Sequence, residues 1–161
     1  HDACCAERGR PLCKALHDVA PDDTWEVSHI GGDRFAPNVL VLPEGLYYGR
    51  LSPEDAPTFV ETVRAGRLDL EHLRGRCAFP FALQAAEVYL RRETGETASG
   101  RPRVLEQVHD DRGMRIRFRI GEGEWDVRLV SEPAEAQQLT CRATALGTAL
   151  RHTLLDVTPV A

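Results

Sequence analysis

The chain has 161 residues, of which 42% are apolar and 28% charged, so it can form one ordinary domain or two small ones. Its 20 basic and 25 acidic residues give a net charge of -5, and no stretch gathers the basic side chains that would neutralise phosphates, so nucleic acid is not an expected partner. The apolar runs are far shorter than the about 20 residues of a membrane-spanning helix, so we expect a soluble protein with no membrane partner.

The first elements are expected to be a helix, a strand and a loop. Pro11–Val19 has apolar residues at helical spacing and Pro at a position that suits a first turn, which predicts a short helix. Trp25–Ser28 alternates weakly and favours a strand. His29–Asp33 contains two glycines, which permit backbone conformations that other residues resist, and is therefore expected to be a loop.

A hairpin and a second helix should follow. The apolar run Val39–Leu42 is typical of a strand buried on both faces, and Pro43–Gly45 is a turn before a second strand, Leu46–Leu51. Ser52–Asp55 then combines a capping hydroxyl, a proline and acidic residues, which is typical of a helix start, and Gly66 should end that helix.

These elements make up most of a thioredoxin-like layer, in which only a strand ahead of the first helix is missing. We expect that strand upstream of His1. Leu68–Arg76 is expected to be a charged connector and Phe79–Glu93 a long amphipathic helix.

The last part of the chain has the alternation of antiparallel strands. The expected strands are Val104–Val108, Met114–Ile120, Glu124–Val130, Leu139–Arg142 and Leu154–Val157, with hairpin turns at Asp110–Gly113 and Gly121–Gly123. The predicted class is therefore α+β, with an N-terminally incomplete thioredoxin-like domain at residues 1–69 and a helix with a mainly antiparallel β domain at residues 70–161.

The cysteines favour a reducing compartment. There are five of them, and the adjacent pair Cys4-Cys5 cannot easily form a disulfide with itself, so a secreted disulfide framework is disfavoured. We expect a cytoplasmic protein. Cys13, Cys77 and Cys141 are isolated in sequence, and buried structural thiols are the simplest interpretation of all three.

Four residues near the amino end form a candidate metal constellation. Cys4 and Cys5 lie just ahead of the first predicted helix, and His29 and Asp33 flank the Gly-Gly loop four positions apart. Thiolate, imidazole and carboxylate can all donate to a cation. The alternative interpretation of the spacing is a plain turn in which Asp33 caps the loop.

Three stretches carry a family resemblance: DACCAERGRPL at residues 2–12, WEVSHIGGDRFA at residues 25–36 and LPEGLYYGR at residues 42–50. In this order they resemble the sucrase/ferredoxin-like family of thioredoxin-like ferredoxins, closely over residues 1 to about 52. The resemblance implies a domain that holds a 2Fe-2S cluster and moves single electrons.

The resemblance also implies a ligand set. Relatives are described with two cysteine and two histidine ligands, the histidines lying in a His-x-Gly-Gly-His loop. His29 occupies the first of these loop positions, and Cys5, or its neighbour Cys4, occupies the second cysteine position. Asp33 stands where the pattern has its second histidine, either as a ligand or as a residue that orients His29. The first family cysteine would precede His1, so the chain as given is expected to hold an incomplete cluster or none.

These observations favour a cytoplasmic electron carrier that works with a redox partner protein and is not itself an enzyme. No nucleophile motif, Cys-x-x-Cys pair or paired glycosidase carboxylates are present, so no hydrolase activity is expected. One alternative is a zinc or other structural metal module built from the same four residues. Another is a cluster-free thioredoxin-like interaction module. Arg34 and Arg50 flank the site, where they would dock an acidic redox partner, balance cluster charge or simply pair with acids and carbonyls.

Overall fold

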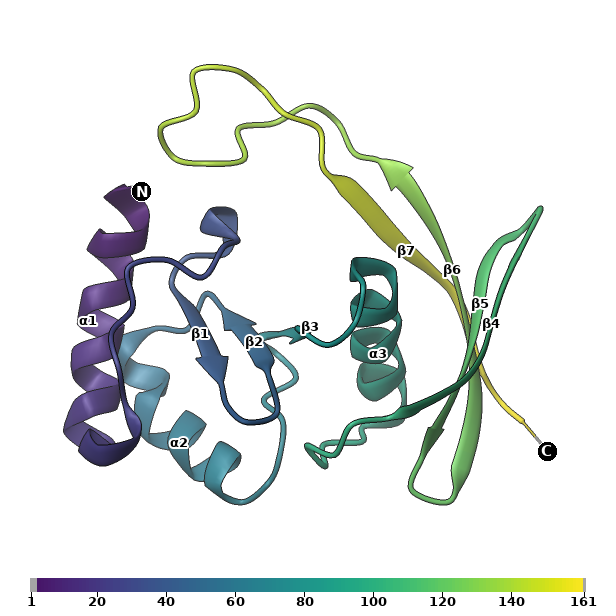
Figure 1. The fold of residues 1–161 in the computed structure, drawn as a ribbon, viewed down its shortest axis with the longest axis horizontal. Coiled ribbons are helices and arrows are strands. Elements are labelled where there is room, and N and C mark those ends of the chain that lie inside the picture. Colours follow the sequence, from purple (N-terminus) through teal and green to yellow (C-terminus); the bar gives the residue numbers. More distant parts are fainter. Residues whose placement is uncertain (1–2, 161) are drawn as a thin grey trace.

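Two antiparallel sheets and three α-helices are found in residues 3–160, which this computed structural model describes (Figure 1). The first sheet has the strand order β1-β2-β3 and the second the order β4-β5-β6-β7. The predicted α+β class is confirmed, and the thioredoxin-like description of the first half stays a prediction. The elements are α1 (Ala3–Val19), β1 (Asn38–Val41), β2 (Leu46–Gly49), α2 (Ala56–Arg64), β3 (Leu73–Arg76), α3 (Phe81–Thr94), β4 (Arg103–Asp110), β5 (Gly113–Ile120), β6 (Gly123–Pro133) and β7 (Leu150–Pro159).

Helix α1 begins earlier than predicted. It starts at Ala3, so Cys4 and Cys5 lie in its first turn, and Pro11 lies inside the helix. The prediction took Pro11 as a first-turn residue, but the Ala, Glu and Arg residues before it are good helix formers and extend the helix toward the amino end. Leu12 and Leu16 form its buried face, as their spacing predicts.

The predicted strand at Trp25–Ser28 is absent from the structure. This segment has no regular secondary structure, and the side chains of Trp25 and Val27 are 79% and 62% exposed. Its alternation of side chains does not by itself make a strand, because a strand also needs a partner for its backbone hydrogen bonds.

The predicted hairpin is confirmed, with β1 antiparallel to β2 and Val39 opposite Tyr48. Tyr48 is buried and packs edge-to-face on Phe59 of α2, with the ring centroids 4.9 Å apart. The expected burial of β1 on both faces is wrong. Strand β1 is the edge of its sheet, its residues are half-buried, and Leu42 just after it is exposed.

Strand β3 was not predicted. The expected connector Leu68–Arg76 contains a strand, because Leu73–Arg76 pairs antiparallel with β2 and Leu73 is buried. The two Arg residues that alternate with Leu and Gly make this segment look like a solvent-exposed connector. In the structure their side chains have hydrogen-bond partners inside the protein, so the segment can form a strand. The first sheet thus extends beyond residue 69, and the division into two domains at that point stays a prediction.

The start of α2 is as predicted. Ser52 and Asp55 form a capping box around the short 3₁₀ turn Pro53–Asp55, and α2 follows directly. The helix ends at Arg64, and Gly66 adopts a positive φ of 66° just beyond it.

Helix α3 lies between the two sheets (Figure 1). Its apolar residues pack on β5 and β6, where the second core contains Leu83, Leu90, Ile116, Phe118, Val127 and Leu129. Both predicted hairpin turns of the second sheet are confirmed, at Asp110–Gly113 and Gly121–Gly123. No helix in the described part of the chain is both long and apolar enough to cross a lipid bilayer.

The predicted strand Leu139–Arg142 is wrong. These residues belong to a long loop, residues 134–149, between β6 and β7, in which Gln137 and Gly147 form an isolated bridge. The loop extends away from the second sheet toward the amino end of α1 (Figure 1). A segment in that position has no neighbouring strand to pair with.

Candidate metal centre

Three of the four predicted donors come together from separate parts of the chain. Cys5 lies in the first turn of α1, His29 precedes the Gly-Gly loop, and Asp33 begins the 3₁₀ turn Asp33–Phe35. Gly31 and Gly32 have φ angles of 84° and 77°, which only glycine adopts without strain. These two residues let the chain turn back so that His29 and Asp33 meet.

Asp33 lies at the centre of this group. Its Oδ1 accepts a hydrogen bond from the Sγ of Cys5 at 3.3 Å and lies 3.3 Å from the Nδ1 of His29. One donor atom from each of the three residues lies within 4.8 Å of the others. This spacing is compatible with all three side chains binding a single cation.

The thiol of Cys5 is protonated at neutral pH in the metal-free protein. Burial, then the hydrogen bond to Asp33 and the negative charge of that carboxylate, raise the pKa of Cys5 to about 12, and Cys4 adds to the effect. Because metals bind the thiolate form, a metal at Cys5 would have to displace this proton, and its binding would be coupled to proton release.

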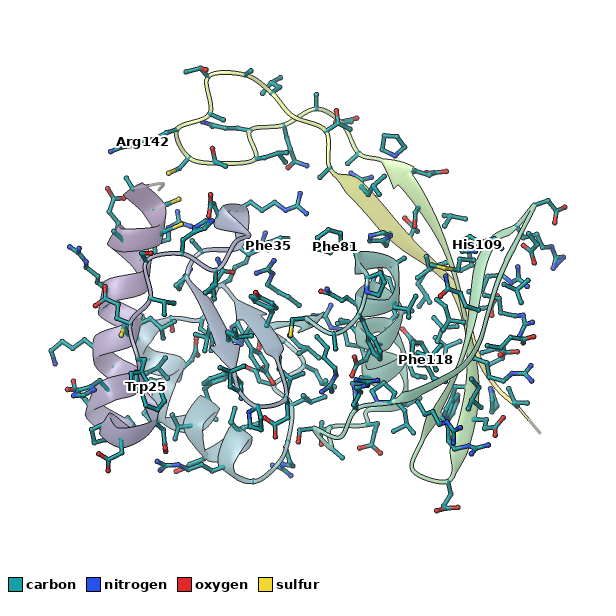
Figure 2. The ribbon with its side chains drawn as sticks, in the orientation of Figure 1. Trp25, Phe35, Phe81, His109, Phe118 and Arg142 are labelled. Atoms are coloured by element: carbon teal, nitrogen blue, oxygen red, sulfur yellow. The ribbon has the colours of Figure 1, made fainter. Side chains whose placement is uncertain are left out.

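Cys4 and Cys141 extend the cluster of sulfur atoms. The backbone nitrogen of Cys4 donates to the Sγ of Cys141 at 3.4 Å. The sulfur atoms are drawn in yellow near the amino end of α1 in Figure 2. Cys141 was expected to be an isolated buried thiol, but it is exposed and lies beside the candidate site. No sequence pattern could have revealed this, because the contact depends on the path of the loop 134–149.

The other two cysteines lie outside this group. Cys77 is exposed, contrary to the expected burial, and Cys13 is half-buried in α1. The candidate ligands also line part of a groove of about 940 Å³ bordered by α1, β1 and α2. Most of the side chains that line this groove are apolar, whereas His29 itself is exposed.

The donor types fit a metal that accepts sulfur and nitrogen. Cysteine and histidine are ligands of both zinc and iron-sulfur clusters, whereas the Asp33 carboxylate is a harder donor. Zinc in a structural site and a 2Fe-2S cluster each take four protein ligands. Cys5, His29 and Asp33 are three candidates for these ligands, and Cys4 is the neighbouring fourth.

Comparison with known families supports the motif resemblance. The family model described as sucrase/ferredoxin-like matches residues 1–75. Over residues 1–75 the chain is similar to the sucrase/ferredoxin-like family. This family region contains all four candidate donors and extends past the three motifs into β3. Searches of the curated proteins and of the solved structures found no significant match.

Proposed function

We propose that this protein of the sucrase/ferredoxin-like family is a single-electron carrier that holds a 2Fe-2S cluster in the intact protein. The observation that supports this most directly is the convergence of Cys5, His29 and Asp33 within 4.8 Å, inside the family region. A 2Fe-2S cluster accepts and returns one electron when bound, and its potential depends on ligand type and on hydrogen bonding.

In this proposal each donor has a distinct role. Cys5 supplies the sulfur ligand and His29 the imidazole ligand. A neutral imidazole compensates less ferric charge than a thiolate, so His29 would raise the reduction potential. Asp33 either binds directly or accepts a hydrogen bond from the ring nitrogen of His29 and fixes the ring orientation. Cys4 is the further sulfur donor beside Cys5.

The wider proposal places the protein in the cytoplasm with a redox partner protein, as a carrier without hydrolase activity. The carboxylate at the centre of the group favours one competing function, a structural zinc module, because oxygen donors are more usual for zinc than for iron-sulfur clusters. A cluster-free interaction module is the remaining alternative.

The test is the iron and acid-labile sulfide content of the protein purified without oxygen from its natural gene, so that any flanking sequence is included. We expect equal amounts of iron and sulfide, a visible absorption band that bleaches on reduction, and loss of all three in Cys5→Ala and His29→Ala. Matched controls are Cys77→Ala, an exposed cysteine outside the group, and His109→Ala, at the far end of the second sheet (Figure 2).

A colourless protein without sulfide would overturn the electron-transfer proposal. Stoichiometric zinc in that protein, lost in the same two variants, would establish the structural metal module instead. If the protein binds neither iron nor zinc and both variants keep their fold, the cluster-free interaction module is the function that the result supports.

A further inference from the structure

Three arginine side chains surround one aromatic ring close to the candidate metal centre. The guanidinium carbons of Arg34, Arg50 and Arg74 lie 4.7, 5.4 and 4.2 Å from the ring centroid of Phe35. Because all three lie within 5.4 Å of one point, no two of them are further apart than twice that distance. Figure 2 labels Phe35, beside the 3₁₀ turn that also contains Arg34.

These arginines have no carboxylate partner among residues 3–160. In the part of the chain that the structure describes, none of the three makes an ion pair with Asp or Glu. Arginines elsewhere in the chain do: Arg115 and Arg117, for example, share Asp126. Three positive charges are therefore held together in a protein whose net charge is negative.

The backbone around Arg74 is shaped to accommodate its side chain. A Cβ at Gly32 would lie 2.5 Å from an Arg74 guanidinium nitrogen, and a Cβ at Gly49 would lie 2.7 Å from Arg74 Cδ. The Nη1 of Arg74 donates to the side-chain oxygen of Asn38 at 2.6 Å, and the Nδ2 of Asn38 donates to the carbonyl of Gly32 at 3.0 Å. These contacts hold Arg74 in one orientation.

Arg50 is held by its backbone. Among the non-glycine residues that the structure describes, Arg50 has a positive φ angle, 67°. This backbone conformation costs free energy for a residue with a Cβ. Its N–H donates to the carbonyls of Phe35 and Pro37, each at 2.9 Å. These bonds hold Arg50 beside the Phe35 turn.

Electrostatics oppose this arrangement in the absence of a ligand. Burial, followed by the charges of Arg34 and Arg50, lowers the pKa of Arg74. Arginine nevertheless stays protonated at neutral pH, so the repulsion persists. A bound anion would remove it, and the planar N–H forks of guanidinium groups match the oxygens of phosphate.

We propose that Arg34, Arg50 and Arg74 form a binding site for an oxyanion of at least two negative charges, of which a phosphate group is the model. The Phe35 ring holds the guanidinium groups by cation–π contact. The Nη1 of Arg74 is bonded to Asn38, and the anion would bind the other N–H groups of the three side chains. None of the three arginines is a candidate metal ligand, so the proposal does not require the cluster, although Arg34 directly follows Asp33 in the same turn.

The experiment is a calorimetric titration of the full chain with inorganic phosphate at low salt. We expect saturable binding that weakens at least about tenfold in Arg34→Gln and in Arg74→Gln. Arg112→Gln, in an exposed turn of the second sheet, is the matched control and should bind like the wild type. His29→Ala should also bind phosphate normally, which separates this site from the metal centre.

Sulfate should compete with phosphate, and chloride at the same ionic strength should not. Phosphoserine, titrated in parallel, distinguishes free phosphate from a phosphate group on an organic carrier, and binding of either supports the site. Absence of saturable binding, equal loss in Arg112→Gln, or displacement by chloride would overturn the proposal. Arg34 is exposed, so its variant tests the site even if Arg74→Gln fails to fold, and circular dichroism monitors both.

Discussion

The Sγ of Cys141 accepts a hydrogen bond from the backbone nitrogen of Cys4 at 3.4 Å, although 137 positions separate the two residues in sequence. The contact brings the loop 134–149 of the second half against the first turn of α1. It also places a sulfur atom that lies outside the family region beside the predicted ligands of the metal centre.

Mild oxidation of the metal-free chain should trap this contact. With diamide as the two-electron oxidant, we expect a Cys4–Cys141 disulfide, detected by mass spectrometry as a cross-linked peptide pair. Cys77 is also exposed to solvent but lies outside this group, and it should not link to Cys4. Cross-links of Cys4 to Cys77 at the same yield would contradict the position of the loop.

Asp33→Asn should make the Cys5 thiol more reactive. The Asp33 carboxylate accepts the thiol hydrogen bond and adds negative charge, and both effects, after burial, raise the pKa of Cys5. Removing the charge lowers that pKa, so more thiolate exists at pH 9, and each pKa unit changes the thiolate population about tenfold. Because burial remains, we expect a several-fold increase in the alkylation rate of Cys5.

The rate is measured by mass spectrometry after timed iodoacetamide labelling at pH 9. Cys77 in the same molecule is the internal reference, and its rate should be the same in wild type and variant. An unchanged Cys5 rate in Asp33→Asn would show that Asp33 does not raise the pKa of this thiol.

Sequence patterns predicted the parts of the molecule that depend on local chemistry. The capping box at Ser52 and Asp55 and the hairpin of β1 and β2 depend on neighbouring residues, and both were found as expected. The pairing of His29 with Asp33 also follows from a local motif, because two glycines between them turn the chain.

The features that were missed depend on distant partners. Strand β3 exists because Leu73 packs in the hydrophobic core that contains Leu46 and Tyr48, and because its backbone pairs with β2. The arginine cluster requires Arg74 to reach a ring in a turn that lies 39 positions earlier, at Phe35. Cys141 reaches α1 only because β6 and β7 hold both ends of its loop. No local period in the sequence encodes such contacts.

Asp55→Ala should destabilise the protein at neutral pH but not in acid. The backbone N–H and the hydroxyl of Ser52 donate to Asp55 Oδ2 at 2.7 and 2.8 Å, and these bonds hold the pKa of the carboxyl below its usual value. A carboxyl with a lowered folded-state pKa contributes stability above its unfolded pKa of about 3.9, and that contribution is lost as the pH falls through the folded-state pKa.

We therefore expect Asp55→Ala to lower the free energy of unfolding by about 1 kcal/mol at pH 7, with a difference that shrinks below pH 4. Urea unfolding at several pH values measures it. Glu54→Ala, at the neighbouring exposed acid, is the control and should have little effect at any pH. A difference for Asp55→Ala that persists in acid would rule out the charged capping interaction as its source.

Glu87 of α3 is an acidic side chain buried between two buried arginines. Its Oε1 accepts hydrogen bonds from Arg76 of β3 at 3.1 Å and from Arg91 of α3 at 3.0 Å. The exposed fractions of Glu87, Arg76 and Arg91 are 0%, 1% and 0%. The two arginines also donate to the carbonyls of Ser99 and Gly100, so this cluster ties α3, β3 and the segment before β4 together.

Glu87→Ala should be strongly destabilising, because it leaves two buried guanidinium groups without their negative partner. Removing one member of a buried ionic cluster typically costs about 3–5 kcal/mol. Glu93→Ala, an exposed acid on the same helix, should change the free energy of unfolding by less than about 0.5 kcal/mol. Urea unfolding of both variants gives the comparison. Glu87 joins β3 of the first sheet to the helix that packs on the second sheet. Its loss should therefore lower the stability of both halves together, in a single unfolding transition. Two transitions at separate urea concentrations in the variant would instead support two independent domains.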